Sequence, residues 1–444
     1  MEEINIIGGG FAGSEAAWQC ANRGIKVNLF EMKPVKRSPA HFSDNFAEVV
    51  CSNSLGSQID GNASALIKKE LKLLNSLVME AAEATKVPAG GALAVDRDLF
   101  SQYITKKLEE HPLIEIHREE VTDIDTSKVT IIATGPLTSS ALSQSLVKIT
   151  GEEYFHFFDA AAPIVEHDSL NFDIIFEQSR YDKGDGMYLN CPFDKEQYEL
   201  FWNEIIKAEL APVKNFDVYV ENKNFFEGCM PIEELAKRGI DTPRYGPLKP
   251  VGLTNPRSDK KPYAVVQLRQ DNAAASLYNL VGFQTQLKWG EQKRVFSLIP
   301  GLENAEFVRF GVMHRNAYIN SPKLLNPTTQ LRNLKNIFIS GLLTGVEGYI
   351  ESCAMGALSG INAVRFIKGQ EMLVLPETSM MGALSRYVSN PEITKNFQPI
   401  NSNWGIIKPL EEKIRDKKLR NLALSERAVK DFSEFVKATE LSTV

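Results

Sequence analysis

The sequence has few cysteines and no long apolar run. Its 444 residues include five cysteines, an odd number, and these lie far apart with no CxxC pair. This distribution argues against a disulfide framework or a zinc ribbon and favours a reducing compartment. No apolar stretch approaches the ~20 residues that a membrane-spanning helix needs, and the acidic start of the chain is unlike a signal peptide. We therefore expect a cytoplasmic protein that makes no contact with a membrane.

Histidine is also scarce, and the net charge is small. The six histidines are dispersed without the spacing of metal ligands, so no metal site is predicted. The formal net charge of −6 neither indicates nor excludes a nucleic-acid partner. A hydrophobic content of 43% and a charged content of 24% are those of an ordinary globular protein. Composition alone leaves the function open.

The N-terminal segment predicts a dinucleotide-binding unit. An apolar strand over residues 3–7 is followed by a glycine motif, a helix from residue 14, and a second strand over residues 25–30 that ends on Glu31. The motif consists of Gly8, Gly9, Gly10, Phe11, Ala12 and Gly13. Its glycines permit a tight turn, a close approach to a pyrophosphate and close packing of helix on strand, while the helix N-terminus attracts phosphates. An acid at the position of Glu31 accepts hydrogen bonds from ribose hydroxyls.

Two later segments favour FAD over NAD as the cofactor. An apolar strand over residues 129–133 leads into a turn that contains Gly135, as in FAD-containing oxidoreductases. A buried strand over residues 337–340 leads to a glycine-rich loop and a helix of small residues. The N-terminus of that helix would stabilise a reduced, anionic flavin. We expect FAD to be bound by the first motif together with Gly135, Gly341, Glu347 and Gly348.

These elements predict an α/β fold: a Rossmann-like FAD-binding domain of the glutathione-reductase type with an inserted α+β domain. The insertion is indicated by short, aromatic-rich strands that begin near residue 150. We expect the first part of the FAD-binding domain over residues 1–149 and its second part over residues 301–370. The inserted substrate or RNA domain is expected over residues 150–300, and a mostly helical region over residues 371–444.

Several longer blocks resemble one family, the folate/FAD-dependent tRNA (uracil-5-)-methyltransferases. These blocks cover residues 48–56, 87–97, 246–253, 266–270, 282–289, 310–316 and 403–405. Related flavoproteins that install carboxymethylaminomethyl groups on wobble uridine share the N-terminal and 341–348 regions but lack most of the middle blocks. The resemblance implies that methylenetetrahydrofolate donates a one-carbon unit and that NADH or NADPH supplies electrons through FAD. The implied product is 5-methyluridine in tRNA, typically at position 54 of the T loop.

Two cysteines within the family motifs are candidates for catalysis. Carbon 5 of uracil becomes nucleophilic only when a group adds to carbon 6, and a thiolate suits that role. Cys51 lies in a polar, turn-rich segment that can expose a thiol, and Cys229 lies near several acids that would raise its pKa unless a cation is close. We predict that both are catalytic, and the sequence leaves open which of them attacks uracil. The other cysteines are interpreted as structural: Cys20, Cys191 and Cys353.

The family resemblance also implies a folate site. A pterin that lies flat against a flavin needs a second planar group on its far face. In the family a histidine takes this position, and the matching residue is His314. Tyr349 is a second candidate for folate binding, and Phe283 ranks with it as a possible stacking residue.

RNA binding requires cations that neutralise phosphates, and a uracil in a folded loop must be extruded to reach a flavin. We therefore expect a groove with an aromatic platform. The candidate cations are Lys33, Lys36, Arg37, Lys249, Arg257, Lys260, Lys261 and those of residues 413–420.

Three other functions remain open from the sequence. The same chemistry could act on a uridine of 23S ribosomal RNA. A small-molecule FAD-dependent oxidoreductase would oxidise NADH without folate or RNA, and it would leave Cys51 and the middle blocks unexplained. A non-enzymatic flavoprotein that acts as an RNA chaperone or assembly factor would bind RNA even without both cysteines and would form no product.

Overall fold

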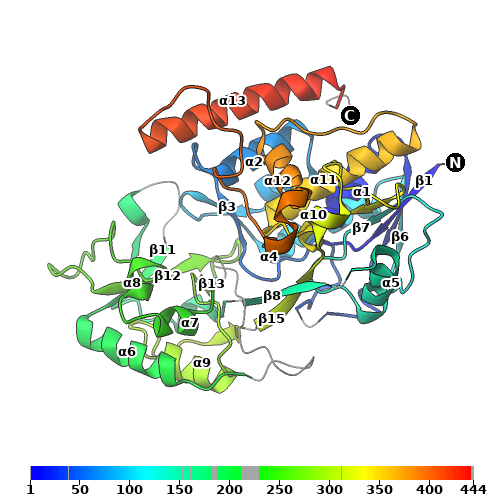
Figure 1. Cartoon of the computed structure of the whole chain (residues 1–444). Helices are drawn as coiled ribbons and strands as arrows, with labels where there is room; N and C mark the ends of the chain where they lie inside the picture. Colours follow the sequence, from blue (N-terminus) through cyan, green and yellow to red (C-terminus); the bar gives the residue numbers. More distant parts are fainter. Residues whose placement is uncertain are drawn as a thin grey trace.

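The computed structural model describes residues 2–38, 40–152, 154–160, 162–182, 188–211, 230–311 and 313–441. For residues 155–160, 313–315 and 396 it describes the main chain alone. Figure 1 shows a larger lobe and a smaller lobe, with a two-stranded ribbon between them.

The larger lobe is built on a parallel sheet of five strands in the order β16-β7-β1-β2-β6. The strands are β1 (Glu3–Ile7), β2 (Lys26–Phe30), β6 (Ile114–His117), β7 (Thr130–Ile132) and β16 (Ile337–Ile339). They are short and mostly buried, as expected of parallel strands that helices cover on both faces. Strand β16 follows the smaller lobe in the sequence and pairs with β7. The sheet therefore contains segments from both sides of the smaller lobe. This topology confirms the predicted α/β, Rossmann-like fold class.

Two helices pack closely against each other over the sheet, α1 (Phe11–Ala21) and α11 (Tyr349–Ile367). Gly356 of α11 allows this approach, because a Cβ atom there would lie 2.2 Å from the carbonyl oxygen of Ala12. Helix α1 begins at Phe11 rather than at the predicted Ser14, since Gly10 is extended and acts as its N-cap. The last residues of the glycine motif therefore form the first helical turn.

The remaining elements of the larger lobe surround this pair of helices. The helices are α2 (Ala63–Leu73), α3 (Leu77–Ala84), α4 (Arg97–Glu109), α5 (Ser140–Thr150), α10 (Ser321–Leu324) and the 3-10 helix η4 (Gly341–Thr344). A small antiparallel sheet consists of β3 (Ser54–Ser57), β5 (Ala92–Val95) and β4 (Lys86–Val87). Helix α4 follows β5 directly, and the Asp96 carboxylate caps it by accepting hydrogen bonds from the Asp98 and Leu99 amides. The loop that holds Cys51 precedes β3.

The smaller lobe has its own six-stranded sheet and its own hydrophobic core. The strands are β9 (Ile164–Glu166), β10 (Phe176–Gln178), β11 (Tyr188–Phe193), β12 (Ala264–Gln270), β13 (Leu277–Leu280) and β14 (Phe307–Arg309), in the order β10-β11-β12-β13-β9-β14. The helices are α6 (Lys195–Lys207), α7 (Ile232–Lys237), α8 (Thr242–Tyr245) and α9 (Trp289–Phe296), with 3-10 helices η1 (His167–Ser169) and η2 (Arg180–Asp182). The chain enters this lobe through β8 (Phe155–Ala160) and leaves it through β15 (Met313–Tyr318), which pair with each other. The division of the chain at residues 150, 300 and 370 stays a prediction.

The C-terminal region contains α12 (Met380–Val388), the 3-10 helix η5 (Pro391–Asn396) and the long α13 (Lys417–Ala438). Helix α13 lies across the larger lobe against α2 (Figure 1) and buries Leu424, Ala428, Phe432 and Val436. None of the helices in the described ranges is long and apolar enough to span a membrane.

The buried Glu70 on α2 fixes the start of α12. Its two carboxylate oxygens accept hydrogen bonds from the amides of Met380 and Met381, at 2.7 and 2.8 Å. Burial raises the pKa of Glu70 to about 8, although both amide donors act in the opposite direction. The carboxyl therefore holds its proton more tightly in the folded chain than in the unfolded chain, where the pKa is near 4.5.

This shift predicts a pH dependence of stability. Glu70 contributes to the free energy of unfolding below the unfolded pKa, and this contribution is lost as the pH rises toward 8. The reason is that between the two pKa values the carboxyl ionises in the unfolded state but stays protonated in the folded state. Between pH 5.5 and 8.5 we expect wild type to lose about 3 kcal/mol more free energy of unfolding than Glu70→Gln, which cannot ionise. Urea denaturation at the two pH values measures this difference. Equal pH slopes for the two proteins would contradict it.

Candidate functional site

A cavity of about 710 Å³ lies where α1, the ends of β2 and β7, and the start of α11 meet. The predicted cofactor residues that line it are Gly8, Gly9, Gly10, Phe11, Ala12, Glu31, Gly135, Gly341, Glu347 and Gly348. Gly13 is not part of the lining. The structure thus brings these predicted residues together at one cavity, although they come from segments far apart in the sequence. Their role in holding a cofactor stays a prediction.

Two glycines of the first motif have different roles. A Cβ atom at Gly10 would meet no protein atom within 4 Å, so the cavity offers open space against the start of α1. A Cβ atom at Gly13 would lie 1.7 Å from the carbonyl oxygen of Gly8. Gly13 therefore serves the packing of α1 on β1, whereas Gly10 leaves room for a ligand beside the helix N-terminus, which favours an anion.

Glu31 connects the glycine motif to the end of β2. Its Oε2 atom accepts a hydrogen bond from the Gly9 amide at 2.8 Å, and its Oε1 atom accepts one from the Lys33 amide at 3.0 Å. The side chain is 7% exposed and lines the cavity. Each carboxylate oxygen can accept a further hydrogen bond, so this arrangement leaves acceptor capacity for ribose hydroxyls.

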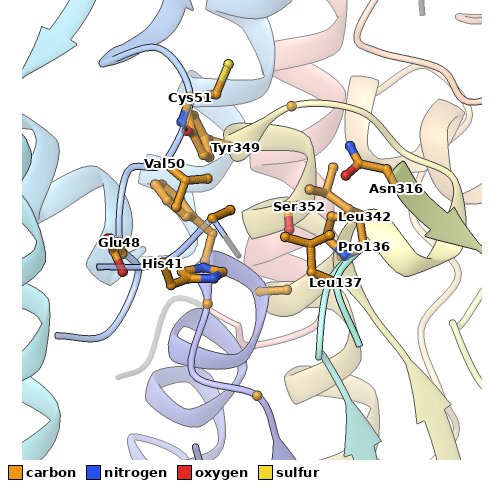
Figure 2. Close-up of a pocket in the computed structure, with 18 of the residues that line it drawn as sticks. His41, Glu48, Val50, Cys51, Pro136, Leu137, Asn316, Leu342, Tyr349 and Ser352 are labelled. Atoms are coloured by element: carbon orange, nitrogen blue, oxygen red, sulfur yellow. Dashed lines mark hydrogen bonds between the residues drawn. The ribbon is translucent and has the colours of Figure 1, made fainter. Parts of the chain in front are cut away.

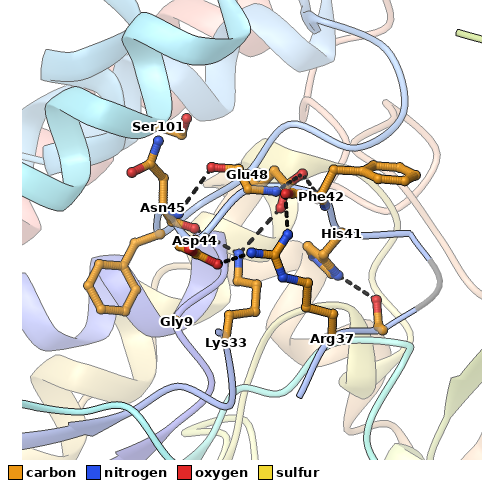
Figure 3. Close-up of polar contacts among 12 residues, drawn as sticks. Gly9, Lys33, Arg37, His41, Phe42, Asp44, Asn45, Glu48 and Ser101 are labelled. Atoms are coloured by element: carbon orange, nitrogen blue, oxygen red, sulfur yellow. Dashed lines mark hydrogen bonds and ion pairs between the residues drawn. The ribbon is translucent and has the colours of Figure 1, made fainter. Parts of the chain in front are cut away.

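A charged cluster borders the cavity beyond Glu31. The Lys33 ammonium donates to the Asn45 carbonyl at 2.7 Å and lies 3.3 Å from Glu48 Oε2 (Figure 3). Burial, and then the charge of Lys33, lower the pKa of His41, which also lines the cavity. Because Lys33 is only 4% exposed, it is not available to an RNA phosphate, and its prediction as an RNA contact was wrong. The sequence suggested a surface cation because it does not show the partner Glu48.

The loop that carries Cys51 is held through its main chain. The Cys51 amide donates to the Tyr349 hydroxyl at 2.7 Å, and Arg97 donates to the carbonyl oxygens of Val49 and Cys51 at 2.6 and 2.7 Å. Arg309 donates to the Val50 carbonyl. Figure 2 shows Cys51 beside Tyr349 at one side of the cavity, and its sulfur points away from His41 and Glu48. Cys51 is partly exposed, as a reactive thiol requires.

Three arginines surround this loop, with one buried carboxylate among them. Arg97 pairs with Asp271 at 2.8 Å, and Arg269 donates to Asn53 Oδ1 at 3.0 Å. Burial lowers the pKa of Arg97, but Asp271 outweighs this effect and the net pKa lies above its ordinary value. An ionised Cys51 interacts favourably with both Arg97 and Arg309. The charges of Arg97 and Arg309 therefore favour an ionised Cys51.

These arginines were not predicted as site residues, although the sequence around two of them indicates a buried charge. Arg269 lies in β12, an otherwise largely apolar strand, and a charge in such a strand indicates a buried partner or a site. Arg97 directly follows the apolar strand β5. Arg309 carried no comparable signal, because its role depends on contact with a loop far away in the sequence.

Tyr349, the first residue of α11, joins the glycine motif to the Cys51 loop. Its ring stacks on Phe11, with centroids 4.5 Å apart and an interplanar angle of 23°. Its hydroxyl accepts the hydrogen bond from Cys51, and burial raises its pKa above the ordinary value. The phenol therefore stays protonated at neutral pH. Its role in folate binding stays a prediction.

Two predicted site residues cannot be placed. Cys229 lies outside the described residues, and the His314 side chain does as well. The main chain of His314 is in β15, where it pairs with Asp159 of β8. The cysteines interpreted as structural, Cys20, Cys191 and Cys353, are fully buried. Phe283 is also fully buried, in the core of the smaller lobe, so a stacking role for its ring is excluded.

Loss of Arg97 is expected to detach the Cys51 loop. Asp271 has a side chain that is 3% exposed, and Arg97 is its ion-pair partner. Arg97→Ala leaves this carboxylate buried without the cation, which should lower the free energy of unfolding by about 3–5 kcal/mol. Denaturant unfolding measures the loss, and the double variant Arg97→Ala/Asp271→Asn should recover part of it. A loss below about 1 kcal/mol in the single variant would contradict the role assigned to this pair.

Comparisons with known proteins agree with this geometry. A family model described as "Glucose inhibited division protein A" matches residues 3–371. A methylenetetrahydrofolate–tRNA-(uracil-5-)-methyltransferase TrmFO from Acetivibrio thermocellus is 57% identical over 436 residues, which cover 98% of this chain and 99% of the relative. The protein of the same name from Listeria monocytogenes serovar 1/2a is 56% identical over 428 residues, which cover 96% and 97%.

A solved structure supports the fold. GidA from Aquifex aeolicus, in its form II crystal, has a TM-score of 0.70 at 17% identity, and the match covers 100% of this chain and 74% of that one. At this identity the likeness concerns the fold alone. On the full-length matches above, the chain belongs to the family of methylenetetrahydrofolate–tRNA-(uracil-5-)-methyltransferases, within the wider group that the glucose inhibited division protein A model describes.

Proposed function

We propose that this protein is a cytosolic, FAD-dependent enzyme that methylates carbon 5 of a uridine in tRNA, at position 54 of the T loop. Methylenetetrahydrofolate is the one-carbon donor, and NADH or NADPH is the reductant. The observation that carries the proposal is the joining of a dinucleotide-type cavity to a cysteine loop through Tyr349. The names of the relatives, which specify folate, tRNA and the 5 position of uracil, support it.

The cavity fits FAD. The open space at Gly10 lies beside the N-terminus of α1, where a pyrophosphate is favoured. Ser402 lines the cavity, and its Oγ atom is buried without a hydrogen-bond partner among the described residues. Residues Gly8 to Ala12 would hold the pyrophosphate, and Glu31 would hold the ribose. Gly341 and Gly348 would contact FAD in the segment that precedes α11. FAD bound there would pass electrons from the nicotinamide cosubstrate to the one-carbon unit.

We assign the chemistry on uracil to the cysteines, of which Cys51 lines the cavity. We assign the addition to carbon 6 to Cys51 or Cys229, and that addition makes carbon 5 nucleophilic. Arg97 and Arg309 stabilise the negative charge of the thiolate. After the methylene carbon has bonded to carbon 5, loss of the carbon 5 proton expels the group that carried this carbon. Addition of a hydride, which FAD would supply when bound, completes the methyl group, and departure of the cysteine restores the double bond between carbons 5 and 6. His314 and Tyr349 are proposed to position the pterin.

Methylation of 23S ribosomal RNA and small-molecule oxidation are not favoured, because the relatives are named as methyltransferases of tRNA. The test is nucleoside mass spectrometry on unmodified tRNA and 23S transcripts treated with the FAD-loaded enzyme, NADPH and methylenetetrahydrofolate. The proposal requires folate-dependent 5-methyluridine in the tRNA T loop. If 5-methyluridine formed only in ribosomal RNA, the substrate would be ribosomal RNA rather than tRNA. NADPH consumption without 5-methyluridine would indicate an oxidoreductase.

A further inference from the structure

A ladder of three parallel aromatic rings lies on the smaller lobe. It consists of Trp289, Phe310 and Phe307, and we call it the aromatic ladder. The Trp289 and Phe310 centroids are 5.6 Å apart at 15°, and those of Phe310 and Phe307 are 5.5 Å apart at 12°. Trp289 is 62% exposed, although an indole of this size is normally well covered in a folded protein. The outer member of the ladder therefore presents a ring to solvent.

The ladder is attached to the hydrophobic core of the smaller lobe. Phe307 contacts the fully buried Phe296, with centroids 6.4 Å apart, so the inner end of the ladder is rooted in the hydrophobic core. The buried Gln292 of α9 donates to the Gly311 carbonyl at 2.9 Å and accepts from the Gly311 amide at 2.7 Å. Helix α9, which begins with Trp289, is thereby fixed to the segment 307–311. Figure 1 shows α9 at the rim of the smaller lobe.

The same segment reaches the Cys51 loop. Arg309, between the two phenylalanines, donates to the Val50 carbonyl. Its guanidinium also lies 5.7 Å from the ring centroid of Phe42, which is 65% exposed. Arg309 is half-buried, and in the described part of the chain it makes no ion pair. One short segment thus connects an exposed ring, a cation without an ion-pair partner and the cysteine loop.

We propose that the outer face of Trp289 stacks with an unpaired nucleobase of the RNA substrate, next to the uridine that reaches Cys51, while Arg309 faces the RNA backbone. This inference rests on the proposed function for the identity of the RNA. Parallel rings with one open face are the arrangement on which unstacked bases bind.

The test is equilibrium binding of an unmodified tRNA transcript to the FAD-loaded, full-length enzyme. Trp289→Ala is expected to weaken binding by roughly 5- to 100-fold, whereas Trp289→Phe keeps a stacking ring and should stay within about threefold of wild type. The salt dependence of binding should be the same in all variants, because the indole neutralises no phosphate. The matched control is Tyr245→Ala, which removes a ring that is 84% exposed and stacks on no other ring in the described residues.

Wild-type affinity in Trp289→Ala, or an equal loss in Tyr245→Ala, would overturn the proposal. So would a changed sedimentation coefficient with unchanged RNA affinity, which would make Trp289 a contact between protein copies. Failure of the proposed function gives a different pattern. In that case wild type forms no 5-methyluridine, and the binding measurement with Trp289→Ala still decides whether Trp289 contacts RNA.

Discussion

Gly10→Val is expected to give a folded protein that purifies without FAD. A Cβ atom at Gly10 meets no protein atom within 4 Å, so the fold accepts the side chain. The same side chain occupies the space beside the N-terminus of α1 in which we place the pyrophosphate. We expect FAD affinity to fall by roughly 10- to 100-fold or more, the usual result of overpacking a fitted site. The flavin absorbance of the purified protein measures the loss.

Gly13→Val is the matched control for this prediction. Its Cβ atom would lie 1.7 Å from the Gly8 carbonyl oxygen, so the variant should destabilise α1 against β1 rather than act on the cofactor alone. A lowered melting temperature in Gly13→Val and a nearly unchanged one in Gly10→Val separate folding from binding. A Gly10→Val protein that stays fully yellow would contradict the assignment of this cavity to FAD.

Cys51→Ala is expected to stop methylation and to leave the flavin in place. The loop around Cys51 is held by main-chain contacts to Tyr349 and Arg97, so removal of the sulfur should leave the loop and the cavity intact. Loss of a nucleophile typically lowers turnover by about 1,000-fold or more. The measurements are 5-methyluridine formation and the flavin spectrum of the same sample.

Two other cysteines provide the comparison. Cys191→Ala removes a fully buried thiol in the smaller lobe, so it should lower stability while the methylation rate is retained. Cys229→Ala tests the second predicted catalytic residue. Normal turnover in both Cys51→Ala and Cys229→Ala would exclude a cysteine nucleophile.

The site residues that were predicted from the sequence are those whose residue type follows from the elements next to them in the chain. The glycine motif and Glu31 belong to one strand–helix–strand unit, in which each residue type follows from a turn, a helix start or a strand end. Gly341 and Gly348 were predicted in the same way, because a strand and a helix flank them. The fold class followed from the order of such units along the chain.

The parts that the sequence did not predict depend on contacts between distant segments. Arg97, Arg269 and Arg309 reach the Cys51 loop from a helix start, a strand and a strand end that are far apart in the sequence. Lys33 resembled a surface cation because the contact with Glu48 forms only after the loop between them has folded back. Pairing of this kind is set by tertiary packing, and neither periodicity nor a local motif encodes it.

The most direct test of the account is an isotope experiment with the wild-type, FAD-loaded enzyme. An unmodified tRNA transcript is incubated with NADPH and methylenetetrahydrofolate labelled with ¹³C in its methylene group, and T-loop nucleosides are analysed by mass spectrometry. We predict that 5-methyluridine at position 54 carries the heavy carbon and that Cys51→Ala forms almost none. Unlabelled 5-methyluridine, or no product while NADPH is consumed, would contradict it.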